Sequence, residues 1–572
     1  MDESEKKRNL FKMFLLKKYI LIYLNNKMED IVQRAGAVFQ TELGKNDRQH
    51  NFFFYEMHFD ILQSTDTSGY MSQSVIREPL VFKNAVREVI HLCVTTLLHN
   101  TKINVSQIIV SVIPSTLPGA GDCVVHTEGL CSFRGVLVEH TVAKKYTEMS
   151  ENIQHRSTGD LILARFINEH GLQMCETKTY AAVLVKLTEI NSDVLELGSV
   201  YNVTGIQTQH GFEAWNCVRH VPRPITINTA NPILTLCASL AYSPWMFTYA
   251  LAAQLGRHLY CPMSFMHLKM GLLLSLASHN RRSNFACIPV LAMGEDTLEA
   301  AQLMQCASQY AVRCVYPTFG QPVLVHHRKD GWLEAGPLLL AQGGVCALGD
   351  WDKYRRADKL GFNIRAAIES GNINVDGSNM PLQSAVWTYW RTPRTFKEKQ
   401  QLQALINVFG MPFLTESHDN YESDVDFHVA KHTSPAIADA STTITHAHLR
   451  EFLQALNEYD VALNAETQSL IKHYFVASRT YRPACLPVRA VGFLTGLTEA
   501  HARLNQRQYA LIEDVVAAIA FYEESIQRVF GVCDLSTPPP LNHVADLTQV
   551  DAGMRLFERW LQNYVTTAQT IA

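Results

Sequence analysis

The residues that could do chemistry lie first in the segment 288–304, IPVLAMGEDTLEAAQLM. An apolar run ends at Gly294 and helix-forming residues follow, which is the strand, glycine and helix order of a phosphate-binding loop. That loop, G-x-x-x-x-G-K-[ST], needs a second glycine for close backbone approach, a lysine for the phosphates and a hydroxyl for Mg²⁺. Counted from Gly294, these positions hold Glu299, Ala300 and Ala301. The segment therefore predicts a site without its cation or metal ligand, and with a carboxylate where a triphosphate would lie.

A second stretch, residues 330–354, reads DGWLEAGPLLLAQGGVCALGDWDKY. It resembles the Walker B region of the minichromosome maintenance (MCM) helicases, in which W-x-L-E-A-G leads through an apolar strand and a glycine pair to D-E-F-D-K. A working ATPase has an acidic pair at the strand end to hold Mg²⁺ and polarise water, whereas this chain has Gly349 and Asp350. The resemblance implies that the scaffold is kept and the metal-binding carboxylate is lost. The shared positions are Trp332, Leu333, Glu334, Ala335, Gly336, Gly343, Gly344, Asp352 and Lys353.

Other positions of the MCM pattern have also changed. The family's sensor asparagine aligns with Trp390, which we expect to pack in the core because an indole has a single donor and no acceptor. The arginine-finger segment aligns with residues 414–419, LTESHD, which contain no arginine, and the hairpin lysine falls at about Gly377. An arginine finger alone contributes about 10³ to 10⁵ in rate, so these losses predict a module without ATPase activity.

The segment 489–504, RAVGFLTGLTEAHARL, resembles the lid helix of MCM proteins. Arg489 stands at the sensor 2 position, while Gly492 and Gly496 replace a glutamate and an arginine of the family pattern. Because the pattern leaves no phosphate for it to meet, we expect Arg489 to be a surface salt-bridge partner. With these positions of the family pattern changed, the sequence predicts no catalytic residue and no cofactor.

The elements that must position these residues form, by the same resemblance, an α/β, MCM-like fold. Strand-like runs at 131–138, 180–187 and 200–205 predict a small barrel of the OB type ahead of a degenerate AAA+ module. The expected divisions are a basic, solvated extension (1–27), a helical N-terminal subdomain (28–120), an OB-like barrel (121–222), a linker (223–232), a degenerate AAA+ core (233–480), a helical lid (481–535) and a C-terminal tail helix (536–572).

The chain's 572 residues carry a formal net charge of −4, so no global basic field attracts nucleic acid. Basic residues near the barrel are no denser than on an ordinary solvated surface, and an expected DNA contact there depends on the resemblance alone. These residues are Lys144, Lys145, Arg156, Arg165, Arg219 and Arg223.

None of the thirteen cysteines forms a C-x-x-C pair. A structural zinc site needs four ligands, usually in close pairs, so we expect no metal. The nearest candidates around the barrel are Cys123, Cys131, Cys175, His126, His140 and His155. The uncharged run 225–256 is broken by polar residues and prolines, which favours a linker and a buried helix over a membrane span.

The segments 330–352 and 497–514 fit the meiotic branch of the MCM family best. That resemblance implies a nuclear role in meiotic double-strand break repair by homologous recombination, homologue pairing and crossover formation. The leading hypothesis is a non-catalytic scaffold in a hetero-complex with other MCM-like proteins. Two alternatives stay open: an ATP-dependent DNA helicase subunit with a divergent pocket, and a protein-only adaptor for other MCM-like chains.

Overall fold

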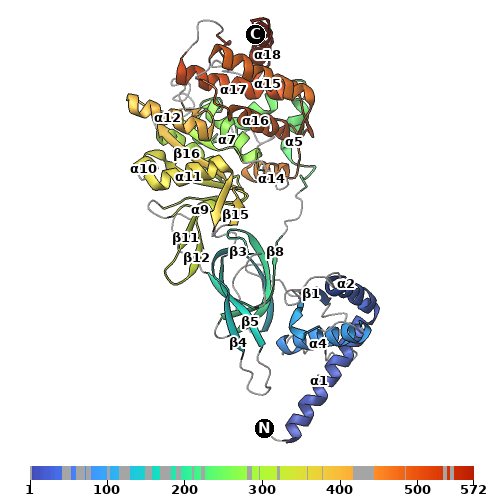
Figure 1. Cartoon of the computed structure of the whole chain (residues 1–572). Helices are drawn as coiled ribbons and strands as arrows, with labels where there is room; N and C mark the ends of the chain where they lie inside the picture. The colour runs from blue at the N-terminus through green and yellow to red at the C-terminus, as the bar shows by residue number, and fades with distance from the viewer. Residues whose placement is uncertain are drawn as a thin grey trace, which may run out of the picture. The chain divides into compact units, whose positions relative to one another are not determined.

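The computed structural model describes residues 3–40, 53–59, 71, 79–98, 103–114, 129–148, 157–167, 182–188, 195–208, 211–220, 226–279, 287–295, 297–318, 322–356, 358–375, 378–415, 444–482, 485–531, 537–540 and 547–571 (Figure 1). The chain divides into two compact units. The first comprises Met1–Glu169, Tyr180–Val221 and His327–Glu334, and the second comprises His170–Thr179, Pro222–His326 and Ala335–Ala572.

The N-terminal part of the first unit combines helices with a parallel strand pair. Its elements are α1 (Glu3–Leu24), α2 (Met28–Gln40), β1 (Phe53–Phe59), α4 (Pro79–Leu97) and β2 (Ile108–Pro114). The predicted solvated extension at 1–27 is wrong, because α1 places Leu16, Ile20 and Leu24 in the core of this part. Their spacing of four residues puts them on one face, while Lys17 pairs with Glu88 of α4. The helical part therefore begins well before residue 28.

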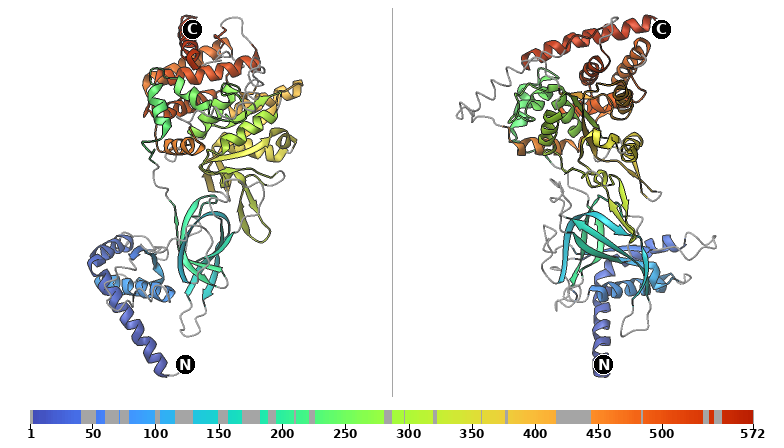
Figure 2. Two further views of the ribbon diagram at one scale, coloured as in Figure 1. Left: turned by 180° about the vertical axis from the view of Figure 1, so that it is seen from behind. Right: turned by 90° about the vertical axis from the view of Figure 1, so that its left-hand side faces the viewer.

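Five strands of the first unit form a closed barrel, as predicted. In barrel order they are β3 (Gly129–Thr141), β5 (Ser157–Ile167), β6 (Val183–Thr188), β8 (Gly211–Arg219) and β7 (Val200–Thr208). Because β3 pairs with both β5 and β7, the sheet has no open edge there, and β6 runs parallel to β8. Chain order gives 1-2-3-5-4, the OB-type arrangement. Figure 2 shows the barrel from two further directions, and β4 (Lys144–Glu148) extends β5 outside it.

A strand from much later in the sequence joins this sheet. β12 (Trp332–Ala335) pairs antiparallel with residues 139–141 of β3, and β11 (Val325–His327) lies on the other side of β12. β7 covers this edge of β3 only from Gly129 to Val136, so the remaining edge is free for β12. Residues 327–334 therefore belong to the first unit, and the prediction that they lie in the AAA+ core (233–480) is corrected.

The second unit contains a parallel five-stranded sheet. Its strand order is β10 (Cys314–Val315), β13 (Val345–Asp350), β16 (Ala385–Arg391), β9 (Val290–Gly294) and β17 (Phe413–Leu414). In chain order this is 2-3-4-1-5, the AAA+ arrangement. Nearly all residues of these strands are buried, which explains their unbroken apolar runs.

Helices flank the sheet and form the lid. Around the sheet these are α5 (Pro232–Ser239), α6 (Met246–Ala252), α7 (Met266–Ala277), α8 (Thr297–Ser308), α9 (Pro337–Leu340), α10 (Trp351–Arg356), α11 (Asp358–Ser370) and α12 (Phe396–Phe409), with the hairpin β14 (Asn372–Val375) and β15 (Ser378–Pro381). The lid comprises α14 (His446–Leu456), α15 (Ala465–Tyr481), α16 (Ala490–Leu504), α17 (Ile512–Phe530) and α18 (Leu547–Ile571), with the short pair β18 (Ala462–Leu463) and β19 (Tyr509–Ala510).

Two details of the helices differ from the sequence expectation. The buried helix expected within the uncharged run 225–256 is two helices, because Ser243 and Pro244 interrupt it. The tail helix expected within 536–572 is α18, which begins only at Leu547 and packs on α15 and α17. None of the helices formed by the described residues has the length and hydropathy needed to span a bilayer.

Candidate functional site

The connection between β9 and α8 occupies the place of the phosphate-binding loop. β9 ends at Gly294 and α8 begins at Thr297, so only residues 295 and 296 lie between them. A phosphate-binding loop needs four residues between its two glycines, and their backbone amides surround the phosphates. Here the second glycine position falls inside the helix. Two of the four positions that would form the loop, residues 297 and 298, therefore belong to α8.

The three aligned positions therefore lie in the first helical turns of α8. Glu299 is in the first turn, where its carboxylate meets the positive end of the helix dipole. Ala300, at the lysine position, is only 1% exposed and faces the core. Ala301 is half-buried. Neither alanine side chain can coordinate a metal ion, and none of the three side chains carries the positive charge that would attract phosphate.

At the end of β13, Gly349 and Asp350 take the place of the acidic pair. Gly349 lies at a register shift of the β13–β16 ladder and has φ +78°, a backbone conformation that glycine adopts more easily than other residues. One Asp350 carboxylate oxygen accepts the backbone N–H of Asp352 at 3.0 Å. Asp350 therefore caps the start of α10 in the way that helix N-cap aspartates do.

The residue at the sensor position is enclosed in the core, as predicted. Trp390 is 1% exposed, and its indole N–H donates to Asp352 Oδ1 at 2.7 Å. Arg355 lies 3.1 Å from the same carboxylate oxygen and 5.9 Å from the Trp390 ring centroid. Asp352, which the family pattern shares, is thus committed to a local ion pair and a hydrogen bond.

A cation does lie beside Gly294, but it is already paired. Arg391 is the register partner of Gly294 on β16 and forms an ion pair with Glu398. Hydrogen bonds from the backbone amides of Thr395 and Arg394 lower the pKa of Glu398 to about 2. That carboxylate stays charged at neutral pH and holds Arg391.

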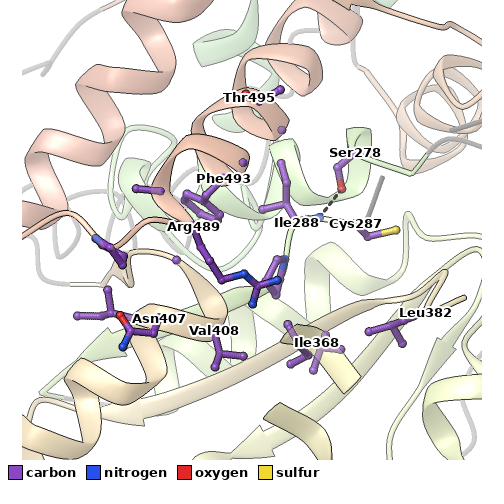
Figure 3. A pocket seen from close by; sticks show the side chains of 18 of the residues that line it. Ser278, Cys287, Ile288, Ile368, Leu382, Asn407, Val408, Arg489, Phe493 and Thr495 are labelled. Atoms are coloured by element: carbon purple, nitrogen blue, oxygen red, sulfur yellow. Dashed lines mark hydrogen bonds between the residues drawn. The ribbon is translucent and has the colours of Figure 1, made fainter. Parts of the chain in front are cut away.

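Arg489 lies away from these positions. It precedes α16 and donates from Nη2 to the backbone oxygen of Glu369 at 2.7 Å, so the predicted salt bridge is replaced by a contact with a carbonyl group. It lines a cavity of about 370 Å³ together with Ile288 and Ser384, which precede β9 and β16 (Figure 3). The cavity is at the amino ends of the strands, whereas Gly294, Asp350 and Trp390 are at or near their carboxyl ends. The structure therefore does not bring Arg489 together with the other aligned positions.

The residues shared with the MCM pattern have structural roles here. A Cβ on Gly336 would lie 2.2 Å from the backbone oxygen of Leu324, and one on Gly344 would lie 2.2 Å from that of Arg313. Trp332 packs under the guanidinium of Arg165, at 4.7 Å. Packing therefore accounts for the residue types at these positions without any nucleotide contact.

The lid motif also supplies a buried polar network that sequence reasoning missed. His501 Nδ1 lies 2.7 Å from Asp514 Oδ1, and Nε2 lies 3.1 Å from Thr248 Oγ1. Burial alone would raise the pKa of Asp514, but His501 and Arg507 together bring it below its usual value. The order of acid, imidazole and hydroxyl is that of a hydrolase triad, yet all three groups are at most 1% exposed. The network ties α16 and α17 to α6 and has no access for substrate.

Comparisons with known proteins agree with this architecture. Residues 16–117 match the model of the MCMDC2 N-terminal domain. The chain is 24% identical over 434 residues to the rat minichromosome maintenance domain-containing protein 2, covering 65% of this chain and 63% of that protein. The human protein of that name is 23% identical over 489 residues, covering 74% of this chain and 71% of that protein. The chain is thus similar in sequence to proteins of the MCM type over about two thirds or more of its length.

The chain is also similar to proteins with helicase names and to an archaeal structure. The probable DNA helicase MCM9 of Arabidopsis thaliana is 24% identical over 265 residues, covering 41% of each chain. The crystal structure of a full-length MCM homolog from Methanopyrus kandleri aligns with a TM-score of 0.56 at 16% identity, over 89% of this chain and 99% of that chain. The chain spans about 63% of the length of the rat and mouse relatives that it matches.

Two of the basic residues considered for DNA contact, Arg165 and Arg219, have carboxylate partners. Arg165 pairs with Glu139 at 2.8 Å, and Arg219 pairs with Glu196 at 2.7 Å. Lys144 is exposed. The candidates Arg156 and Arg223 lie outside the described residues, as do the side chain of Lys145, Gly377 and residues 416–419 of the arginine-finger segment.

The metal-ligand candidates can be followed only in part. Cys123, Cys175, His126 and His155 lie outside the described residues, whereas the buried His140 contacts the backbone oxygen of Thr141 at 3.0 Å. Within the described ranges no three histidine, cysteine or carboxylate groups are grouped as a metal site.

Proposed function

We propose that this chain is a non-catalytic MCM-like scaffold whose ATPase-type module neither binds nor hydrolyses ATP. The observation that carries the proposal is the start of α8 at Thr297, which places half of the loop positions and the second glycine position in the helix. The carboxylate of Glu299 stands at the helix end that would otherwise attract an anion, and the buried Ala300 offers no cation. Asp350 is used as a helix cap.

Titration calorimetry with Mg-ATP tests this proposal directly, and we expect no heat of binding. A triple variant, Glu299→Gly with Ala300→Lys and Ala301→Ser, restores the residue types of the phosphate-binding motif G-x-x-x-x-G-K-[ST]. It should still fail to bind, because the helix begins two residues before the second glycine position. Micromolar binding by the unmodified chain overturns the proposal. Binding by the triple variant alone would show that the missing side chains, and not the short connection, are decisive.

We further propose that the chain acts in the nucleus in meiotic recombination, in double-strand break repair, homologue pairing and crossover formation. The support is its similarity to the minichromosome maintenance domain-containing proteins 2. A partner chain of the MCM type would supply the ATP chemistry, since this module retains its AAA+ strand order without the ligands. Affinity purification of the tagged chain from meiotic cells, followed by mass spectrometry, tests this. Recovery without any MCM-like chain contradicts the hetero-complex.

A protein-only adaptor is the second candidate, and the ion pairs of the barrel favour it. Arg165, Lys186 and Arg219 each have a carboxylate partner, which reduces the net positive charge available to a phosphate backbone. Fluorescence anisotropy with labelled single-stranded DNA at two salt concentrations separates the two roles. A DNA-binding scaffold binds with an affinity that falls steeply with salt, whereas an adaptor does not bind.

A further inference from the structure

The cavity beside Arg489 owes its space to the face that α16 presents to it. Gly492 and Gly496 lie one helical turn apart on that face. A Cβ on Gly492 would meet no atom within 4 Å, and one on Gly496 would approach only Ile288, at 3.6 Å. Each glycine in a helix interior costs about 0.8–1 kcal/mol relative to alanine, so this open face is kept at the expense of helix stability.

The cavity walls are mainly apolar, and one end is positively charged. Ile288, Val408 and Phe493 contribute to the walls, and Figure 3 shows Arg489 extending from the start of α16 toward them. Its guanidinium has five N–H donors, of which the described residues use one, for the Glu369 carbonyl. No side chain caps α16 at Arg489, so the positive end of the helix dipole adds to that charge.

The other end of the cavity is chemically different. Glu499 lies ten residues along α16 from Arg489, which places it about 15 Å away along the helix axis. Arg503 beside it is already committed, donating to the backbone oxygens of Tyr459 at 2.9 Å and Ala277 at 2.6 Å. A ligand with a second negative group at this end would meet the Glu499 carboxylate.

We propose that this cavity binds a small organic monocarboxylate, with its carboxylate at Arg489 and its apolar body along Gly492 and Gly496. The volume of about 370 Å³ is in the range of small-ligand sites. A guanidinium recognises a carboxylate through paired hydrogen bonds, and the apolar walls favour a hydrocarbon body over water. The site lies at the opposite end of the strands from the aligned nucleotide positions, so it does not depend on the proposed loss of ATP binding.

Octanoate, used below its micellar concentration, is the probe, and octanol and octylamine are its uncharged and cationic counterparts. Titration calorimetry on the full chain should show octanoate binding at least about tenfold more tightly than octanol, and octylamine not binding. Arg489→Gln should weaken octanoate binding by about tenfold or more and leave octanol unchanged, because a charge-assisted hydrogen bond is lost.

Gly492→Leu places a side chain in the cavity and should abolish binding of both octanoate and octanol. Its unfolding midpoint in urea should be equal or higher, because leucine favours a helix more than glycine does. The matched control is Gly553→Leu on α18, where a Cβ also meets no atom within 4 Å, and it should bind octanoate normally. The proposal is overturned if no probe binds at millimolar concentration, if octanoate binds no better than octanol, or if folded Gly492→Leu binds like the unmodified chain.

Discussion

The carboxyl end of the parallel sheet and the core beneath the lid differ in whether their polar side chains form buried charge pairs. At the sheet end the aligned positions hold an alanine in the core, a glycine and a capping aspartate, and none forms a buried charge pair. Beneath the lid, Arg482 and Glu523 form an ion pair with both side chains at most 7% exposed, and Tyr474 donates to Glu523 at 2.5 Å. The difference indicates that the buried charged groups beneath the lid hold α15 and α17 together.

The largest expected effect is therefore on stability, from Glu523→Ala. The change leaves the Arg482 guanidinium buried without its carboxylate, and removing one partner of a buried pair costs about 3–5 kcal/mol. Urea unfolding followed by circular dichroism measures the loss. The control is Glu369→Ala on α11, where the exposed side chain should change the free energy of unfolding by less than about 0.5 kcal/mol. Equal effects of the two variants would remove the proposed contrast.

A second expected effect is a dependence of the unfolding free energy on pH. His279 is 6% exposed, and its Nε2 lies 2.7 Å from the backbone oxygen of Gly344. Burial lowers the pKa of His279, although hydrogen bonds to backbone carbonyls partly oppose this. The unfolded chain then takes up a proton below about pH 6.5 while the folded chain stays neutral. Stability should fall as pH drops below that value, by at most about 1.4 kcal/mol per pH unit.

His279→Gln tests the assignment, since it should reduce this pH dependence. The measurement is the urea unfolding free energy at about pH 7 and at about pH 5.5. His327→Gln is the matched control, because that ring is exposed and should leave the dependence as it is. A pH profile unchanged by His279→Gln would assign the proton uptake to another group.

Local patterns predicted the parts of this molecule that local sequence determines. The apolar run before Gly294 and the helix formers after it predicted β9 and α8, and the lid segment that resembles the MCM pattern predicted α16. The start of α8 at Thr297 and the burial of Ala300 were not predictable, because element boundaries depend on packing. α1 was missed because Lys17 and Lys18 interrupt its apolar residues, although one of them pairs with α4.

The sequence also could not predict contacts between segments that lie far apart along the chain. Residues 327–334 join the barrel only because β7 leaves part of the β3 edge uncovered, which no spacing in the sequence reveals. Arg489 was assigned from the family pattern to a nucleotide position, whereas the packing of α16 places it at the amino ends of the strands. The side-chain types at the aligned positions predict a loss of ATPase chemistry, but only the fold showed which end of the sheet each residue faces.

The smallest expected effect tests the role of Asp350 itself. As a helix cap, its carboxylate accepts the Asp352 N–H, so Asp350→Ala should cost about 1 kcal/mol of unfolding free energy. Asp350→Asn keeps an accepting oxygen and should be close to the unmodified chain, because asparagine caps helices as well as aspartate does. A metal ligand would behave differently, since both variants would lose the negative charge that Mg²⁺ requires. Urea unfolding of both variants, with and without Mg-ATP, therefore separates the two roles. Stabilisation of the unmodified chain by Mg-ATP that both variants lose would return Asp350 to the nucleotide site and break the contrast between the sheet end and the lid core.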